Sequence, residues 1–89
     1  MRITVDLSLY PLDADYKPAI REFIKLLRTY PDLQLLTNQM STQINGEFAA
    51  VIAAVNDCMR AAMTSGGKVV IVARYLNSDL AIDTTPDLE

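Results

Sequence analysis

The sequence predicts a single α+β domain in which two helices are set among four strands. Three observations predict it: a strictly alternating segment at the N-terminus, two stretches with apolar residues at helical spacing, and a branched apolar run after the second of these. The chain has 89 residues, of which 51% are hydrophobic and 21% charged. That length and balance support one hydrophobic core and leave no room for a second.

The first half of the chain reads as a strand followed by a helix. Over residues 2–10 apolar and polar side chains alternate at a period of two, and Pro11 ends the pairing. A helix is expected from Pro18, which suits a first helical turn, to the Tyr30-Pro31-Asp32 stop. Its apolar residues recur at the spacing of one helix face: Ile20, Phe23, Ile24 and Leu27.

The second half repeats the pattern with shorter strands. Strands are expected over residues 33–37 and 40–45, the latter with Met40, Thr42 and Ile44 on one face. A helix then runs to Met63, with Asn45 as its predicted N-cap, and Gly66-Gly67 supplies a left-handed ending. Residues 68–75 form the last strand, and its run of four branched apolar residues, 69–72, predicts that both of its faces need cover.

The order βαββαβ is that of the ferredoxin-like fold. Right-handed crossovers would place both helices on one face of a four-stranded antiparallel sheet, with strands 1 and 3 in the centre. The other sheet face is then left for water or for a second subunit. Residues 1–75 would form this domain, and residues 76–89, which hold four acidic residues and no basic one, would form an acidic tail on the surface or disordered.

Composition excludes several kinds of chemistry. The chain has no histidine and one cysteine, Cys58, so metal sites of the Cys/His type, nucleophile pairs that need histidine and an internal disulfide are not expected. Cys58 falls on the apolar side of the second helix and is expected to be a small buried residue. Without the tail the net charge is close to neutral, with no cluster of Lys or Arg, so nucleic acid is not an expected partner.

No part of the sequence indicates export or a membrane. No apolar run approaches the roughly 18 residues that span a bilayer, and the alternating N-terminus lacks the solid apolar segment of a signal peptide. Together with the single cysteine, this predicts a cytoplasmic protein without a membrane partner.

Polar residues gather at the end of the first strand and at the neighbouring turn between the second and third strands. Their hydroxyl and amide groups can offer donors and acceptors to the edge of a small planar ring, and a tyrosine can stack on its face. The alternative is that they satisfy loop backbone groups, as Ser, Thr and Asn commonly do. The candidate ligand-binding residues are Ser8, Tyr10, Asn38, Ser41, Thr42 and Gln43.

Two segments resemble a known family. Residues 7–12, Leu-Ser-Leu-Tyr-Pro-Leu, and residues 40–48, Met-Ser-Thr-Gln-Ile-Asn-Gly-Glu-Phe, resemble the thiamine- and hydroxymethylpyrimidine-binding proteins of the YkoF-like superfamily, over about residues 3 to 75. The resemblance implies a non-catalytic ferredoxin-like domain that binds the pyrimidine part of thiamine or its precursor and assembles into dimers or tetramers. It marks Ser8, Tyr10, Ser41 and Thr42 as pocket residues, with Asn38 in a turn where relatives can carry an aspartate.

Three functions follow as expectations. The first is a carrier or sensor that reversibly binds thiamine or hydroxymethylpyrimidine, needs no further cofactor and forms a homo-oligomer. The second is an oligomeric regulatory or interaction module with no small ligand, in which Val70 and Val72 pair subunits across the bare sheet face. The third is an enzyme that uses Asp6 or Glu47 as acid or base, although no nucleophile accompanies either residue.

Overall fold

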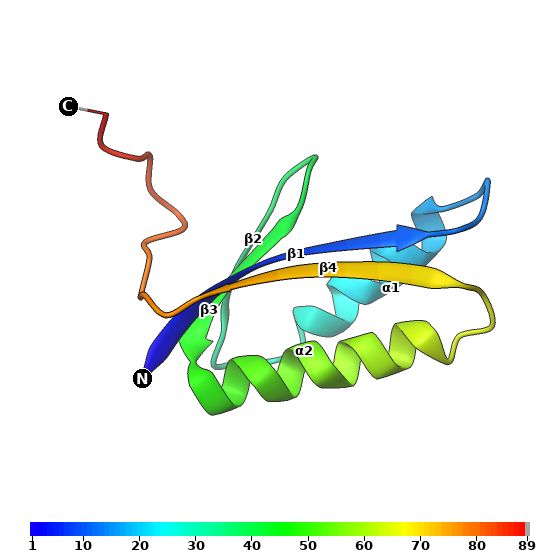
Figure 1. The fold of residues 1–89 in the computed structure, drawn as a ribbon, viewed down its shortest axis with the longest axis horizontal. Coiled ribbons are helices and arrows are strands. Elements are labelled where there is room, and N and C mark those ends of the chain that lie inside the picture. Colours follow the sequence, from blue (N-terminus) through cyan, green and yellow to red (C-terminus); the bar gives the residue numbers. More distant parts are fainter. Residues whose placement is uncertain (89) are drawn as a thin grey trace.

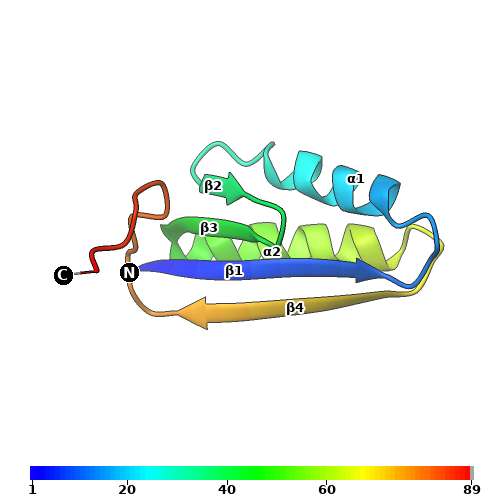
Figure 2. The ribbon, with the colours of Figure 1, turned by 90° about the horizontal axis from the view of Figure 1, so that it is seen from above.

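The computed structural model describes residues 1–88 and confirms the βαββαβ ferredoxin-like architecture. Four antiparallel strands form one sheet in the order β2-β3-β1-β4, and both helices cover the same face of it (Figures 1 and 2). The elements are β1 (Arg2–Pro11), α1 (Lys17–Leu27), β2 (Gln34–Thr37), β3 (Thr42–Glu47), α2 (Phe48–Met63) and β4 (Val69–Leu76).

The core lies between the sheet and the two helices. The odd-numbered apolar residues of β1, from Ile3 to Leu9, are all buried, as the alternation predicts. They pack in one cluster with Phe23 and Leu27 of α1 and with apolar residues of α2. Cys58 belongs to this cluster, and its burial, followed by the nearby charge of Asp57, raises the pKa of the thiol to about 11.

Strand β1 is longer than its neighbour β3, and this difference shapes the molecule. β1 pairs with β3 only as far as Leu7, opposite Thr42, but it pairs with β4 as far as Pro11, opposite Val69. Figure 2 shows β1 continuing beyond the end of the β2-β3 hairpin. Residues 8–11 therefore have no strand beside them on the β3 side, and the sheet has a notch there.

Two expectations about β3 and α2 are wrong. Asn45 does not cap α2, because the β1-β3 ladder continues to Arg2 opposite Glu47 and keeps Asn45 inside the strand; Glu47 takes the N-cap position without a side-chain bond. Met40 does not share a face with Thr42 and Ile44, because it lies in the turn before β3, where it is 84% exposed.

The turn after α2 is formed differently from the expected glycine cap. The helix ends at Met63 with Thr64 as its C-cap, and the hydroxyls of Thr64 and Ser65 donate to carbonyls of the last turn. Gly66 follows with a φ of 111°, a left-handed conformation that favours glycine. The positive φ is thus present, but it serves the turn into β4 and not the cap itself.

The segment after β4 turns back onto the uncovered side of the sheet. The Thr4 hydroxyl donates to the Ser78 carbonyl at 2.8 Å and accepts from the Leu80 amide at 3.1 Å. Asp79 accepts from the amide of Asn45 at 2.8 Å and from Arg2 Nε at 3.1 Å. These bonds, together with the burial of Ile82, fix the first part of the tail over the N-terminal end of β1.

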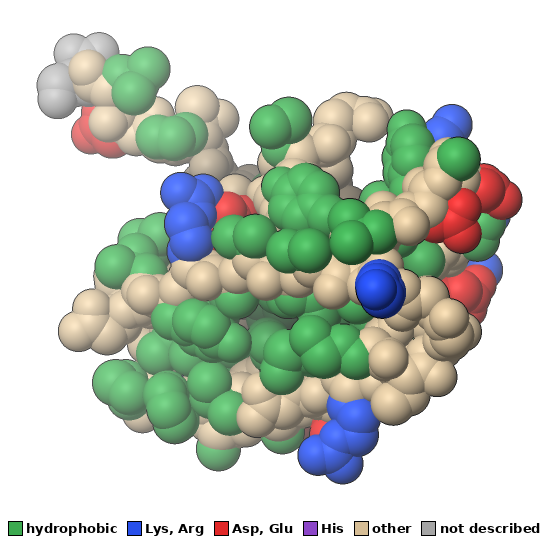
Figure 3. Space-filling model, turned by 45° about the vertical axis from the view of Figure 1, so that its right-hand side comes forward, with side chains coloured by type: hydrophobic (Ala, Val, Ile, Leu, Met, Phe, Trp, Pro, Cys, Tyr) green, Lys and Arg blue, Asp and Glu red, His purple; other side chains and the backbone are tan. Residues whose placement is uncertain are grey.

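The rest of this sheet face is open. Tyr10 lies opposite Val70 across the β1-β4 ladder, and Val72 lies opposite Ser8; the three apolar side chains are about half exposed. Figure 3, which views the molecule obliquely from the β4 edge, shows hydrophobic side chains above and below that strand with few charges among them. In the described residues no helix combines the length and hydropathy that crossing a bilayer requires.

Candidate functional site

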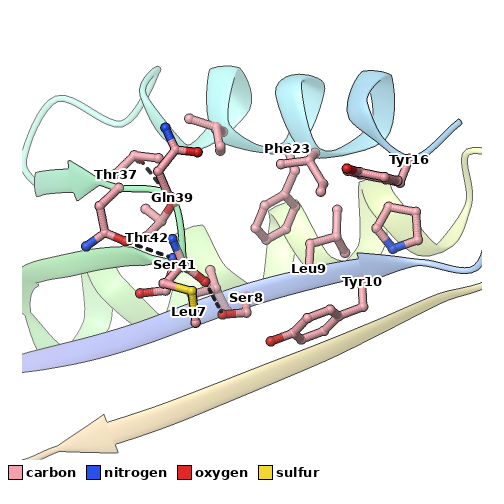
Figure 4. A pocket seen from close by; sticks show the side chains of 15 residues that line it. Leu7, Ser8, Leu9, Tyr10, Tyr16, Phe23, Thr37, Gln39, Ser41 and Thr42 are labelled. Carbon is pink, nitrogen blue, oxygen red and sulfur yellow. Dashed lines mark hydrogen bonds between the residues drawn. The ribbon is translucent and has the colours of Figure 1, made fainter.

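The notch in the sheet opens into a cavity of about 400 Å³. β1 forms its floor, the turn between β2 and β3 forms one wall, and α1 forms the other (Figure 4). A volume of this size falls within the range of small-ligand sites.

The missing partner strand explains how side chains from both sides of β1 reach one cavity. Leu7 and Leu9 point toward the helices, whereas Ser8 and Tyr10 point toward the open side, and all four line the cavity. In a continuous sheet a neighbouring strand would separate them. Here the cavity passes around the free edge of β1, so strand parity does not divide the candidate residues into two groups.

The turn wall is polar and held by its own hydrogen bonds. Asn38 Oδ1 accepts from the backbone N–H groups of Met40 and Ser41 at 2.9 and 3.1 Å. The backbone N–H of Asn38 donates to the Ser41 carbonyl at 3.0 Å. The hydroxyls of Thr37 and Thr42 lie 3.0 Å apart and share a hydrogen bond. The carbonyl of the Asn38 side chain is thus used by the turn, whereas its NH₂ group makes no hydrogen bond among residues 1–88.

A second set of polar contacts ties the turn to β1. The Ser8 hydroxyl donates a long bond of 3.4 Å to the Met40 carbonyl. The pKa of Asp6 is lowered, first by the hydroxyl of Ser41 and then by Arg74, whose Nε donates to Asp6 at 3.1 Å. Asp6 therefore stays ionised beside the site.

The helix wall is apolar and aromatic. Ile20, Phe23 and Ile24 of α1 line this wall. Phe23 lies across the cavity from Leu9 of β1, and Tyr16 stands before the helix at the outer end of the cavity (Figure 4). Among residues 1–88, no charged side chain lines the cavity. The site thus combines an uncharged polar wall with an apolar one, which suits a flat heterocycle with polar atoms along one edge.

Five of the six predicted site residues line this cavity, and one does not. Ser8, Tyr10, Asn38, Ser41 and Thr42 lie around it, whereas Gln43 lies outside. Gln43 lies opposite Asp6, in the part of the sheet where β1 and β3 are paired and no notch is present.

The remaining lining residues were not singled out as site residues by the sequence. The lining residues of α1 have the spacing of a helix face that packs on a core, and the sequence therefore predicted them as core residues. Gln39 and Thr37 lie in the turn segment that the sequence did mark as polar, and Tyr16 carries no pattern of its own.

The structure gives no support to an acid-base pair of Asp6 and Glu47. Asp6 is bonded to Arg74, and Glu47 accepts from the N-terminal amine of Met1 at 3.2 Å. Their positions in the β1-β3 ladder are four residues apart, which is roughly 13 Å along a strand. Among residues 1–88, no group of His, Cys, Asp and Glu side chains is arranged to hold a metal ion.

The fold and the cavity define a small ferredoxin-like domain with a ligand-sized site at the edge of its sheet. Sequence comparison gives the family: the thiamine-binding protein family matches residues 5–88, and the chain belongs to that family. The resemblance expected from the sequence is thereby confirmed. No curated protein matches the chain with comparable significance.

Solved structures share the fold. A candidate thiamine biosynthesis/salvage protein from Thermotoga maritima superposes with a TM-score of 0.81 at 16% identity, covering 93% of this chain and 92% of its own. A Streptococcus pneumoniae protein gives 0.82 at 20% identity, with 93% and 94% covered. A hypothetical protein from Methanocaldococcus jannascii gives 0.74 at 20% identity, with 98% and 88% covered.

Proposed function

We propose that this protein binds thiamine or its hydroxymethylpyrimidine precursor reversibly and without catalysis, as a carrier or a sensor. The observation that carries the proposal is the cavity at the notch, because it brings five candidate polar and aromatic residues together in a chain of the thiamine-binding family. Residues 1–75 would hold the ligand, and the tail, residues 76–89, would not contact it. The cytoplasm is the proposed location, where the buried thiol of Cys58 stays reduced.

The uncharged lining favours the pyrimidine part of the ligand. A cationic thiazolium ring inside the cavity would lose hydration without contacting a free counter-charge, because no acidic side chain of residues 1–88 lines it and the ionised Asp6 beside it is paired with Arg74. The neutral pyrimidine has no such cost. A ligand of about ten heavy atoms at roughly 0.6 to 0.8 kcal/mol per atom would bind with a dissociation constant on the order of micromolar.

Calorimetric titration with hydroxymethylpyrimidine and with thiamine tests the proposal. We expect binding of the pyrimidine, and weaker binding after Thr42→Val or Ser8→Ala, because each removes a hydroxyl from the cavity. Gln43→Ala is the matched control, because it changes a polar residue of the same sheet outside the cavity. The proposal is wrong if neither compound gives heat or thermal stabilisation up to millimolar concentration.

A homo-oligomer is the second part of the proposal. Strand β4 is a long edge strand, and Tyr10, Val70 and Val72 form a half-exposed apolar group beside it. Natural proteins usually cover such edges and patches. An interaction module without a small ligand remains the alternative function that this surface favours.

Pyrimidine binding separates the two functions, and sedimentation reports the assembly that both of them require. Val72→Asp should dissociate the assembly in either case. In the carrier or sensor, Thr42→Val should weaken pyrimidine binding and leave the assembly intact; in the interaction module, no ligand is bound at all. A wild-type chain that sediments as a monomer at micromolar concentration would contradict the oligomer.

A further inference from the structure

The backbone of Leu9 presents an unpaired donor and acceptor at the cavity. The β1-β4 register is continuous, and the Leu12 amide donates to the Lys68 carbonyl, so even-numbered residues of β1 direct their N–H and C=O groups toward β4. On the other side, the Phe48 amide donates to the Met1 carbonyl, which shows that odd-numbered residues face β3. Leu9 is odd, and β3 has already ended opposite Leu7.

The unpaired N–H and C=O groups belong to a residue that is almost fully buried. The residue is only 7% exposed and lines the cavity. Buried backbone N–H and C=O groups are nearly always paired, because an unpaired one loses its hydration without gaining a protein partner. Within residues 1–88 no hydrogen bond of the loops, caps or side chains reaches these two atoms. A bound molecule that supplies both partners would compensate for that loss.

We propose that the N–H and C=O of Leu9 recognise the polar edge of the ligand, as a strand would recognise its neighbour. This inference rests on the proposed function and specifies its chemistry. In an extended strand the N–H and C=O of one residue lie on the same side, so the matching edge carries an acceptor and a donor next to each other. An aminopyrimidine has that edge, in its ring nitrogen and the adjacent amino group.

The cavity selects a small ring over a peptide strand at this edge. Further along β1, Pro11 is the next odd-numbered residue, and it has no N–H to offer an added strand. In the other direction the turn wall closes the notch, with the Ser8 hydroxyl bonded to the Met40 carbonyl. Leu9 thus offers a site one residue long, between Phe23 on the helix wall and Asn38 on the turn wall.

Ligand analogues and amide NMR test the proposal on the full chain. The 4-deamino analogue of hydroxymethylpyrimidine, with hydrogen in place of the amino group, keeps the ring nitrogen and removes the donor. We expect it to bind at least about 10-fold more weakly than the amino compound, because the C=O of Leu9 would then have no partner in the ligand. In ¹⁵N spectra the Leu9 amide should shift on binding of the amino compound and become protected from hydrogen exchange. The amides of Ser8 and Tyr10, which pair with β4, are the internal control.

The outcomes separate this inference from the function on which it rests. If the amino compound binds but the Leu9 amide keeps its shift and exchange rate, or if the two analogues bind equally, the Leu9 contact is wrong and the binding function stands. If neither compound binds, the binding function and the Leu9 contact both fail. Slow exchange of the Leu9 amide in the ligand-free protein would show that the group is already paired and would also overturn the contact.

Discussion

Asn45→Ala should be among the more destabilising polar substitutions in this chain. Asn45 is 2% exposed, accepts from Arg2 Nη2 at 2.7 Å, and donates to Thr4 Oγ1 at 3.0 Å and to Asp79 Oδ1 at 2.8 Å. Alanine removes all three hydrogen bonds, two of which have a charged partner. Each charged bond contributes about 1.5 to 3 kcal/mol when buried and the neutral one about 1 kcal/mol.

Solvent reduces this sum, because the side chains of Arg2 and Asp79 are 43% and 55% exposed and can bind water once released. We therefore expect the free energy of unfolding to fall by about 2 to 4 kcal/mol. Urea denaturation measures it. Gln43→Ala, two residues earlier on the same face of β3, is the control and should cost less than about 1 kcal/mol, since no hydrogen bond of the described residues involves its side chain.

A double-mutant cycle with Asp79→Ala identifies the role of the tail. If Asn45 holds the tail on the sheet, the two substitutions should be coupled, so that the double variant loses less stability than the sum of the two single variants. A loss below about 1 kcal/mol for Asn45→Ala, or strictly additive losses, would refute the reasoning.

Three further predictions concern the sheet, a carboxylate and the thiol. Gly46→Ala should lower stability by about 1 to 2 kcal/mol in thermal denaturation, because the added Cβ would lie 2.7 Å from Leu33 Cδ2; an unchanged midpoint would show that Leu33 moves aside freely. The pKa of Asp6 is lower in the folded chain than in the unfolded one, so its contribution to stability is present above about pH 4 and is lost as the pH falls through the folded value. Acid titration of Asp6→Asn should therefore show a smaller loss of stability below pH 4 than wild type, and equal losses would contradict this. Cys58, with a thiol pKa of about 11, should resist a thiol reagent at pH 8 until urea unfolds the chain, and rapid labelling of the native protein would show that the site opens.

The architecture could be predicted from the sequence because it depends on local patterns. The alternation in β1 and the helical spacing of Ile20, Phe23 and Leu27 determine which side of each element is buried, and the structure agrees with both. Boundaries were less secure where two elements meet without a break. Strand β3 passes directly into α2 at Phe48, so Asn45 looked like a cap by residue type although its pairing with β1 keeps it in the sheet.

The cavity could be predicted only in part. The polar residues of the turn and of β1 were visible as types in unusual places, and five of them do meet. The notch itself depends on how far each neighbour pairs with β1. β3 pairs with β1 only as far as Leu7, opposite Thr42, whereas β4 pairs as far as Pro11, opposite Val69, and no single residue signals that difference. The docking of the tail depends on contacts such as Asp79 with Arg2, which join residues 77 positions apart.

Pro11 has a consequence for how this molecule behaves among its copies. Because its nitrogen is on the side of β1 away from β4, the proline does not interrupt the existing ladder. A strand from another chain that tried to extend the sheet there would meet a position without a donor. Pro11 thus disfavours the addition of a strand from another chain at this edge of β1. A small ligand that bonds to one residue only is not affected by the missing N–H.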